Sequence, residues 1–149
     1  MDIIDRINAE QPKLVVDLGC GYNEFKGKIN NLIGIDPYNK NADLEVGTLE
    51  YKTDKLFDVI LCLGSVNFGS KQKIVAEVGR CVQLLAKNGI MFFRVNPGLS
   101  HDKPEADWIE FYAWNVPFII ELSEKFNLKI LDIRDDTNQR KYFIYRKDK

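Results

Sequence analysis

The segment Lys13-Leu-Val-Val-Asp-Leu-Gly-Cys-Gly21 decides how the rest of the chain is interpreted. Residues 13–17 form an apolar run that ends in an aspartate, which is typical of a strand buried in a parallel sheet. The turn that follows contains Gly19 and Gly21, which tolerate positive φ and let a ligand approach the backbone closely. Taken alone, this pattern fits a structural turn as well as a ligand-binding elbow.

A second strand ends in another carboxylate. Residues 32–36 read as a strand that is stopped by Pro37. Asp36 follows Gly19 by 17 residues, a length over which one strand–connection–strand unit returns the chain beside its start. An acid at this place accepts the ribose hydroxyls of an adenosine in many open α/β sheets. The alternative is an aspartate that caps a turn or helix before Pro37.

The remaining pattern predicts one α/β domain over residues 1–149. We expect a Rossmann-like three-layer α/β/α sandwich, with a mostly parallel sheet and an antiparallel C-terminal edge strand. Helical turns are expected at 2–9, and helices at 22–31, at 71–86 after an N-cap at Ser70, and at 116–126 after an N-cap at Asn115. Further strands are expected at 43–46, 57–63 and 90–95, with an antiparallel pair at 128–135 and 141–146.

A dinucleotide is the competing ligand for such a glycine turn. Its fingerprint, Gly-x-Gly-x-x-Gly, has a third glycine and places a pyrophosphate on a helix N-terminus. Glu24 occupies the third position here, and its carboxylate would repel a pyrophosphate. S-adenosylmethionine contains adenosine and a cationic sulfonium but no phosphate, so it avoids the conflict. Residues 1–60 carry 7 bases and 11 acids, a net −4, which suits a positive ligand.

Four segments, in this order and spacing, resemble motifs of the class I S-adenosylmethionine-dependent methyltransferases. They are Val15-Val-Asp-Leu-Gly-Cys-Gly21, Gly34-Ile-Asp36, Leu56-Phe-Asp-Val-Ile-Leu-Cys-Leu63 and Leu84-Leu-Ala-Lys-Asn-Gly-Ile-Met-Phe-Phe93. The resemblance covers residues 13–146 and implies S-adenosylmethionine as the cofactor. It also implies the transfer of a methyl group to an acceptor.

The resemblance assigns roles in cofactor binding along the strand ends. The glycine turn and Asp17 would lie at the methionine part, Asp36 at the ribose, the segment after the short third strand at the adenine, and the fourth strand end at the methyl donor. The implied residues are Asp17, Gly19, Cys20, Gly21, Asp36, Pro37, Thr48, Leu49, Leu63, Gly64 and Ser65. Family members often place an acid in the segment that is Gly47-Thr48-Leu49 here, so this sequence departs from the pattern at the adenine.

The sequence does not identify the methyl acceptor. Candidate catalytic residues are Ser65, Asn67 and His101, the last as a base near pH 7 or as an exposed loop histidine. Segment 64–69 lacks the Asn/Asp-Pro-Pro-Tyr/Phe signature of enzymes that methylate nucleic-acid bases or glutamine. We therefore expect a small-molecule acceptor, and nucleic acid is not indicated. A non-catalytic binding module or partner subunit is the alternative, with a dinucleotide-dependent oxidoreductase behind it.

Composition sets the remaining expectations. The three cysteines lack Cys-x-x-Cys spacing, and there is one histidine, so no metal site is expected. Neither a secretory signal nor a membrane span is apparent, and a cytoplasmic protein follows. The short segment before residue 13 leaves the acceptor cleft open or closed by a second chain, and oligomeric state stays undetermined. Trp108, Tyr112 and Trp114 form either an aromatic wall for the acceptor or part of the core.

Overall fold

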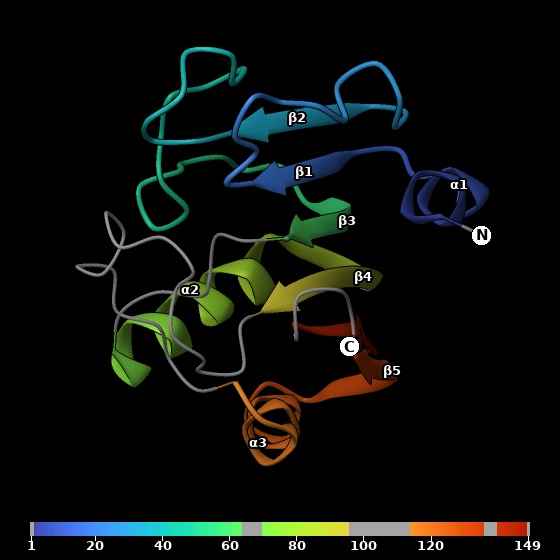
Figure 1. The fold of residues 1–149 in the computed structure, drawn as a ribbon, viewed down its shortest axis with the longest axis vertical. Helices are drawn as coiled ribbons and strands as arrows, with labels where there is room; N and C mark the ends of the chain where they lie inside the picture. Colours follow the sequence, from blue (N-terminus) through green and yellow to red (C-terminus); the bar gives the residue numbers. More distant parts are fainter. Residues whose placement is uncertain (1, 64–69, 96–113, 136–139, 149) are drawn as a thin grey trace.

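The computed structural model describes residues 2–63, 70–95, 114–135 and 140–148. These residues form a sheet of six strands in the order β2-β1-β3-β4-β6-β5, with three helices (Figure 1). The strands are β1 Val15–Leu18, β2 Leu32–Ile35, β3 Phe57–Cys62, β4 Leu85–Val95, β5 Leu128–Asp135 and β6 Lys141–Lys147. The helices are α1 Ile3–Ala9, α2 Lys71–Leu84 and α3 Val116–Lys125.

The sheet is mixed, as the sequence predicts. Strands β2, β1, β3 and β4 are parallel neighbours, and β6 runs antiparallel to both β4 and β5. The antiparallel pair therefore lies at one edge of the sheet. The C-terminal strand β6 is not itself the edge strand, because it is inserted between β4 and β5.

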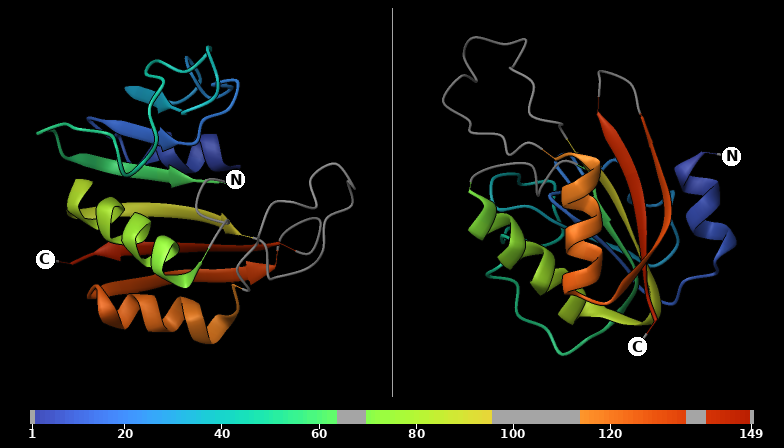
Figure 2. Two further views of the ribbon diagram at one scale, coloured as in Figure 1. Left: turned by 90° about the vertical axis from the view of Figure 1, so that its left-hand side faces the viewer. Right: turned by 90° about the horizontal axis from the view of Figure 1, so that it is seen from below.

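Helices lie on both faces of the sheet. Figure 2 shows α2 and α3 on one face and α1 on the other. A larger core cluster under α2 and α3 contains Trp114, Phe93 and Phe143, and a smaller one under α1 contains Ile7, Leu61 and other residues. Alternate residues of each central strand enter the two clusters, which is why these strands read as continuous apolar runs.

Both predicted N-caps are confirmed. The Ser70 hydroxyl accepts a hydrogen bond from the Lys73 backbone N–H at 3.2 Å, and the Asn115 side chain accepts one from the Phe118 N–H at 2.9 Å. Helix α2 ends at Leu84, two residues earlier than predicted. The reason is that the chain enters β4 directly, with Leu85 already paired with Phe57.

Segment 22–31 is a series of turns, so the helix predicted there is wrong. Asn23, Gly27 and Asn31 have φ of 61°, 83° and 61°, and such left-handed residues interrupt a right-handed helix. Likewise, the strand predicted at 43–46 is reduced to one parallel bridge between Ile35 and Leu44. Sequence pattern located both connections correctly but assigned them too much regular structure.

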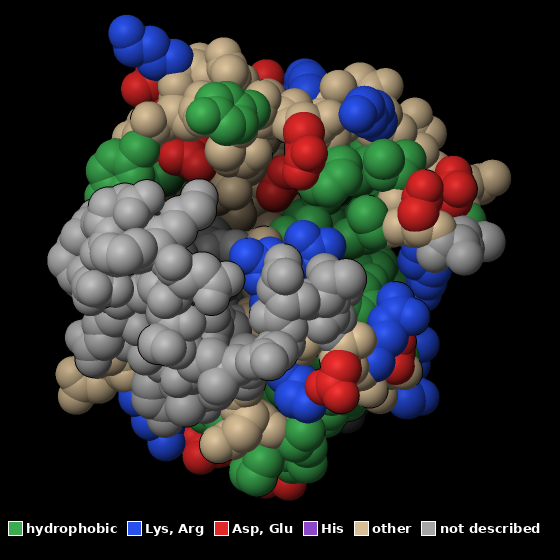
Figure 3. Space-filling view, in the orientation of Figure 1, with side chains coloured by type: hydrophobic (Ala, Val, Ile, Leu, Met, Phe, Trp, Pro, Cys, Tyr) green, Lys and Arg blue, Asp and Glu red, His purple; other side chains and the backbone are tan. Residues whose placement is uncertain are grey.

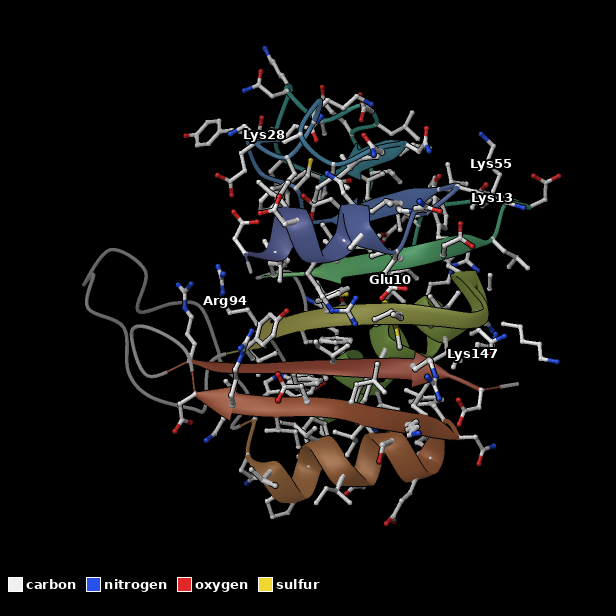
Figure 4. The ribbon with its side chains drawn as sticks, turned by 90° about the vertical axis from the view of Figure 1, so that its right-hand side faces the viewer. Glu10, Lys13, Lys28, Lys55, Arg94 and Lys147 are labelled. Atoms are coloured by element: carbon white, nitrogen blue, oxygen red, sulfur yellow. The ribbon has the colours of Figure 1, made fainter. Side chains whose placement is uncertain are left out.

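The face that carries α1 is unevenly covered. In Figure 4, α1 stands in front of β1 and β3, whereas no helix of the described residues stands in front of β4, β6 and β5. Arg94 lies on this face near the carboxyl end of β4 (Figure 4). In the part of the chain that the structure describes, no helix has the length and apolar character needed to cross a bilayer.

Candidate functional site

The glycine turn after β1 is a tight elbow fixed to the end of β2. Gly19 and Gly21 adopt φ of 73° and 58°, a region that glycine enters without the steric penalty of a Cβ atom. The backbone N–H groups of Gly19 and Cys20 both donate to the Ile35 carbonyl, each at 2.9 Å. The elbow therefore turns directly beside the carboxyl end of the neighbouring strand.

Asp36, the residue that follows β2, also binds the elbow. Its Oδ2 accepts a hydrogen bond from the Gly21 N–H at 3.0 Å, and its Oδ1 accepts one from the Tyr38 N–H at 2.8 Å. The side chain is half-buried. Each carboxylate oxygen keeps a further lone pair, so a carboxylate held in place by the backbone can still accept hydrogen bonds from a ligand.

A cavity of about 700 Å³ opens at this point, within the usual range for small-molecule sites. Its lining unites five of the predicted residues, Gly19, Asp36, Pro37, Thr48 and Leu49, with others that the sequence did not single out. These others are Tyr38, Glu45, Val46, Gly47, Glu50, Lys73 and Glu77. The lining is acidic because it contains four carboxylates and one lysine. Figure 3 shows Asp and Glu side chains at the surface in the upper part of the view.

Asp17 lies beside the elbow but does not line this cavity. Its side chain is 3% exposed, and no described residue donates a hydrogen bond to its carboxylate. Burial, followed by the nearby charges of Glu24 and Asp36, raises the pKa of Asp17 to about 7. An additional positive charge near the elbow would lower that pKa, because it would stabilise the ionised carboxylate.

Cys20 lies in the elbow as a buried thiol. Burial raises its pKa to about 11, and the negative charges of Asp17 and Asp36 add to this shift. The thiolate that a nucleophile requires is therefore scarce near neutral pH. Cys62 and Cys81 are also buried and free, and their sulfurs lie 3.9 Å apart although 19 residues separate them in sequence.

Segment 22–31 forms turns instead of a helix, and polar side chains stabilise these turns. The Asn23 amide donates to the Asn41 carbonyl at 3.1 Å, and the Asp43 carboxylate accepts from the Gly34 N–H at 2.8 Å and from Lys26 Nζ at 3.1 Å. Desolvation opposes ionisation of Asp43, but these hydrogen bonds outweigh it and lower its pKa. This network positions the elbow against β2.

Gly34 is required by close packing in the same region. A Cβ atom at Gly34 would lie 2.1 Å from Asn23 Oδ1 and 2.9 Å from Cys20 Sγ, distances that atoms in folded proteins do not tolerate. The buried Asn23 side chain thus occupies the space above β2 that a larger residue would fill. The sequence motif Gly34-Ile-Asp36 therefore combines a packing requirement with the carboxylate.

Several predicted positions fall elsewhere. Leu63 is partly buried and packs against the core cluster under α1. Gly64, Ser65, Asn67 and His101 lie outside the described residues, as do Trp108 and Tyr112. Trp114 is fully buried against Phe93, Phe118 and Phe143, so it belongs to the core and not to an exposed aromatic wall.

Glu77 is the cavity residue with the clearest overlooked signal. It stands on α2 among the apolar positions Ile74, Val78 and Cys81, all fully buried. A carboxylate inside an apolar helical stripe is unusual and points to a specific environment. Within the lining from residues 45–50, the family resemblance indicated Thr48 and Leu49, whereas Glu45, Val46 and Glu50 gave no signal because the connection before β3 has no regular pattern.

The shape of the elbow and the charge of the cavity help to distinguish a dinucleotide from a ligand without phosphate groups. A dinucleotide site of the Rossmann type binds its pyrophosphate at the N-terminus of the helix that follows the first strand. Here the elbow continues into turns at 22–31 instead of a helix. The acidic lining of the cavity further disfavours a phosphate and favours a ligand that carries positive charge.

Comparison with known proteins detects structural similarity only. No protein-family model and no curated protein sequence matches the chain. Among solved structures, the N-methyltransferase NodS from Bradyrhizobium japonicum WM9 shares 16% identity at a TM-score of 0.71, covering 98% of this chain and 93% of NodS. The 1,6-didemethyltoxoflavin-N1-methyltransferase of Burkholderia thailandensis, solved with S-adenosylhomocysteine, shares 15% at 0.75, covering 98% and 76% of the two chains. CalS10 from Micromonospora echinaspora, an amino pentose methyltransferase solved with bound S-adenosylmethionine, shares 14% at 0.73, covering 98% and 89%.

Proposed function

We propose that this chain, which has the Rossmann-like fold of the class I methyltransferases, is itself an S-adenosylmethionine-dependent methyltransferase acting on a small molecule in a reducing, cytoplasmic compartment. The observation that carries the proposal is the hydrogen bond that joins the Gly21 backbone to Asp36 at the mouth of an acidic cavity. It brings an accessible elbow and a carboxylate acceptor together, as a nucleoside with an amino-acid tail requires.

The residues present fit such a cofactor. Asp36 would accept the ribose hydroxyls through its remaining lone pairs, and the exposed backbone at Gly19 would lie under the methionine part. The buried carboxylate of Asp17 would offset positive charge at the elbow. When bound, S-adenosylmethionine supplies a methyl group already activated on a sulfonium.

With an activated donor, the protein's main contribution is to position the acceptor. Holding two reactants in line can lower a barrier by about 7–11 kcal/mol. An acceptor such as an amine passes its lone pair to the methyl carbon while the carbon–sulfur bond breaks and sulfur keeps the electron pair. A base such as His101 would be needed only where the acceptor must lose a proton, and Ser65 or Asn67 could help to position the acceptor.

The test uses ligand binding by calorimetry and thermal unfolding. We expect S-adenosylmethionine and S-adenosylhomocysteine, each at 100 times its dissociation constant, to raise the unfolding midpoint by about 5–10 °C, and NAD to leave it unchanged. Asp36→Ala removes hydrogen bonds to a charged group worth about 1.5–3 kcal/mol each, so affinity should fall by at least about tenfold. Unaltered affinity in that variant would contradict the ribose assignment.

An assay of methyl transfer separates an enzyme from a non-catalytic binding module. Amines are the first acceptors to examine, because structural neighbours include an amino pentose methyltransferase and N-methyltransferases. Methyl transfer to any of them supports an enzyme. Tight cofactor binding without transfer to any acceptor would favour the alternative of a non-catalytic binding module.

A further inference from the structure

A second cavity, with a volume of about 730 Å³, lies beside α1 on the sheet face that no described helix covers over β4, β6 and β5. Residues of α1 and its N-cap line one side of this α1 cavity, and residues of β4, β5 and β6 line the other. Its volume is typical of small-molecule sites. Among the described residues, the α1 cavity and the cavity at the glycine elbow share no lining residue, so they are separate candidate sites.

Arginines from three different elements line the α1 cavity. Arg6 belongs to α1, Arg94 to β4 and Arg134 to β5. Arg94 and Arg134 are the direct cross-strand partners of Tyr142 in β6, so these three residues, the arginine row, lie side by side on one face of the sheet. The Arg134 guanidinium lies over the Tyr142 ring, 4.6 Å from its centroid. The fold thus gathers positive charge around one tyrosine.

Two of the three carboxylates in the lining already have other partners. Asp2 is the N-cap of α1, and its Oδ1 accepts a hydrogen bond from the Asp5 N–H at 2.9 Å. Asp135 is paired with Lys141, whose Nζ lies 2.5 Å from Oδ1, and the Asp135 side chain is 82% exposed. Asp2 is exposed as well, so water screens the charge of both carboxylates.

Arg6 and Arg134 retain donors beyond their present ion pairs. Arg6 is paired with Glu10 on α1, and Arg134 Nε lies 3.7 Å from the Asp132 carboxylate. Ion pairs between solvent-exposed side chains are weak, and each guanidinium has five N–H donors. An anion in the α1 cavity can therefore bind both arginines beside their present carboxylates or in place of them.

The charges that act on Tyr142 favour an anion at this point. Tyr142 is 7% exposed, and burial raises the pKa of its hydroxyl. The positive charges of Arg134 and Arg6, together with a hydrogen bond from Arg134, oppose that shift, whereas Asp132 adds to it. Two cations and one acid therefore act on the hydroxyl. Because the hydroxyl accepts from Arg134, its own O–H stays available to a ligand.

We propose that the arginine row and Arg6 bind the phosphate or carboxylate group of a small organic anion. Guanidinium groups match both of these groups through pairs of parallel N–H donors, and the Tyr142 hydroxyl donates a further hydrogen bond. Ile3 and Ile144 also line the α1 cavity and provide apolar surface for the rest of the ligand. This inference does not depend on the proposed function, because the cofactor would occupy the other cavity.

The experiment titrates the protein with phenyl phosphate, benzoate and benzylamine at pH 8 and low ionic strength, followed by NMR of the backbone amides. Both anions should bind more tightly than benzylamine, which has the same ring and a positive charge. Combining Arg6→Gln with Arg134→Gln should weaken the binding of each anion at least about tenfold, because charge-assisted hydrogen bonds are lost. Tighter binding of phenyl phosphate supports a phosphate ester as the ligand, and tighter binding of benzoate supports a carboxylate.

The matched control is Arg146→Gln. Arg146 lies on the same face of β6 as Tyr142, because side chains alternate along a strand, and it is paired with Asp148 at 3.1 Å, but it does not line the α1 cavity. Its substitution should leave the affinity for both anions unchanged. Circular dichroism and urea unfolding establish that each variant is folded.

Two results would overturn the anion site while the proposed function stands. One is that neither anion binds more tightly than benzylamine, and the other is that the double variant binds both anions as tightly as the parent. Saturating S-adenosylhomocysteine should leave phenyl phosphate bound, and displacement would place the anion in the other cavity and overturn the inference. If S-adenosylhomocysteine itself fails to bind, the proposed function fails and the anion site is still judged by the variants.

Discussion

The β1–β2 half of the molecule and the β4–β6–β5 half are stabilised in different ways. In the second half, aromatic rings pack against one another: Phe93 stacks on Phe143 with centroids 4.7 Å apart, and Trp114 meets Phe118 at 4.8 Å. In the first half, Asn23, Asp43 and Asp36 bind backbone groups of turns and strand ends. The half with the elbow therefore has turns and exposed backbone where the other half has packed aromatic rings. Hydrogen bonds from polar side chains stabilise those turns.

The largest expected effect on the free energy of unfolding comes from a substitution in the aromatic half. Trp114→Ala removes a fully buried indole from the core and should lower the free energy of unfolding by about 3–5 kcal/mol. Urea unfolding followed by circular dichroism measures the change. Tyr22→Ala, at a side chain that is 81% exposed in the other half, is the control and should stay within about 0.5 kcal/mol of the parent. A loss below about 1 kcal/mol for Trp114→Ala would show that the aromatic cluster does not dominate this half.

The second-largest expected effect comes from the elbow half, where ionisation of the buried Asp17 carboxyl group destabilises the fold. Burial raises the pKa of Asp17 from its ordinary value of 3.8 to about 7, so the folded chain keeps a proton that the unfolded chain releases between those pH values. The free energy of unfolding should therefore fall as pH rises from about 4 to 7. Asp17→Asn removes this dependence and should stabilise the ligand-free protein at pH 8 by as much as about 4 kcal/mol.

Urea unfolding of the parent and of Asp17→Asn at pH 4.5 and pH 8 provides the measurement. The two proteins should differ much less at pH 4.5, which is close to the ordinary pKa of 3.8, than at pH 8, which is above the raised pKa of about 7. The same variant should bind S-adenosylmethionine more weakly, since it lacks the charge that opposes the sulfonium. A stability difference that is equal at both pH values would contradict the shifted pKa.

The smallest effect contrasts two glycines. Gly34→Ala forces a Cβ atom against Asn23 and Cys20 and should cost about 1–3 kcal/mol, as other cases of overpacking do. Gly79→Ala, on α2, meets only the Phe126 ring at 3.4 Å and should be neutral or stabilise by up to about 1 kcal/mol, because alanine favours a helix. Thermal and urea unfolding compare the two. Similar values for both would remove the argument that the elbow half is tightly packed around Asn23.

Patterns local in sequence were sufficient for much of the fold. Continuous apolar runs predicted the central strands, and the caps at Ser70 and Asn115 marked where α2 and α3 begin. Alternation of apolar and polar residues predicted the antiparallel pair β5 and β6. The helix at 22–31 was wrong because Asn23 and Gly27 adopt left-handed backbone conformations, and the Asn23 side chain is held by hydrogen bonds to residues 41 and 43, which lie far along the chain.

The candidate site was likewise predictable in part from local sequence, and the rest depends on the tertiary structure. The sequence by itself determined that two glycines and an aspartate follow neighbouring strands, since strand length and spacing set where each strand ends. Only the tertiary structure decided that the Gly21 N–H meets Asp36, that residues 45–50 form part of the lining of one cavity, and that Glu77 reaches it from α2. These contacts join residues up to 58 positions apart, from Gly19 to Glu77, and their geometry depends on how helix and sheet pack, which no local pattern encodes.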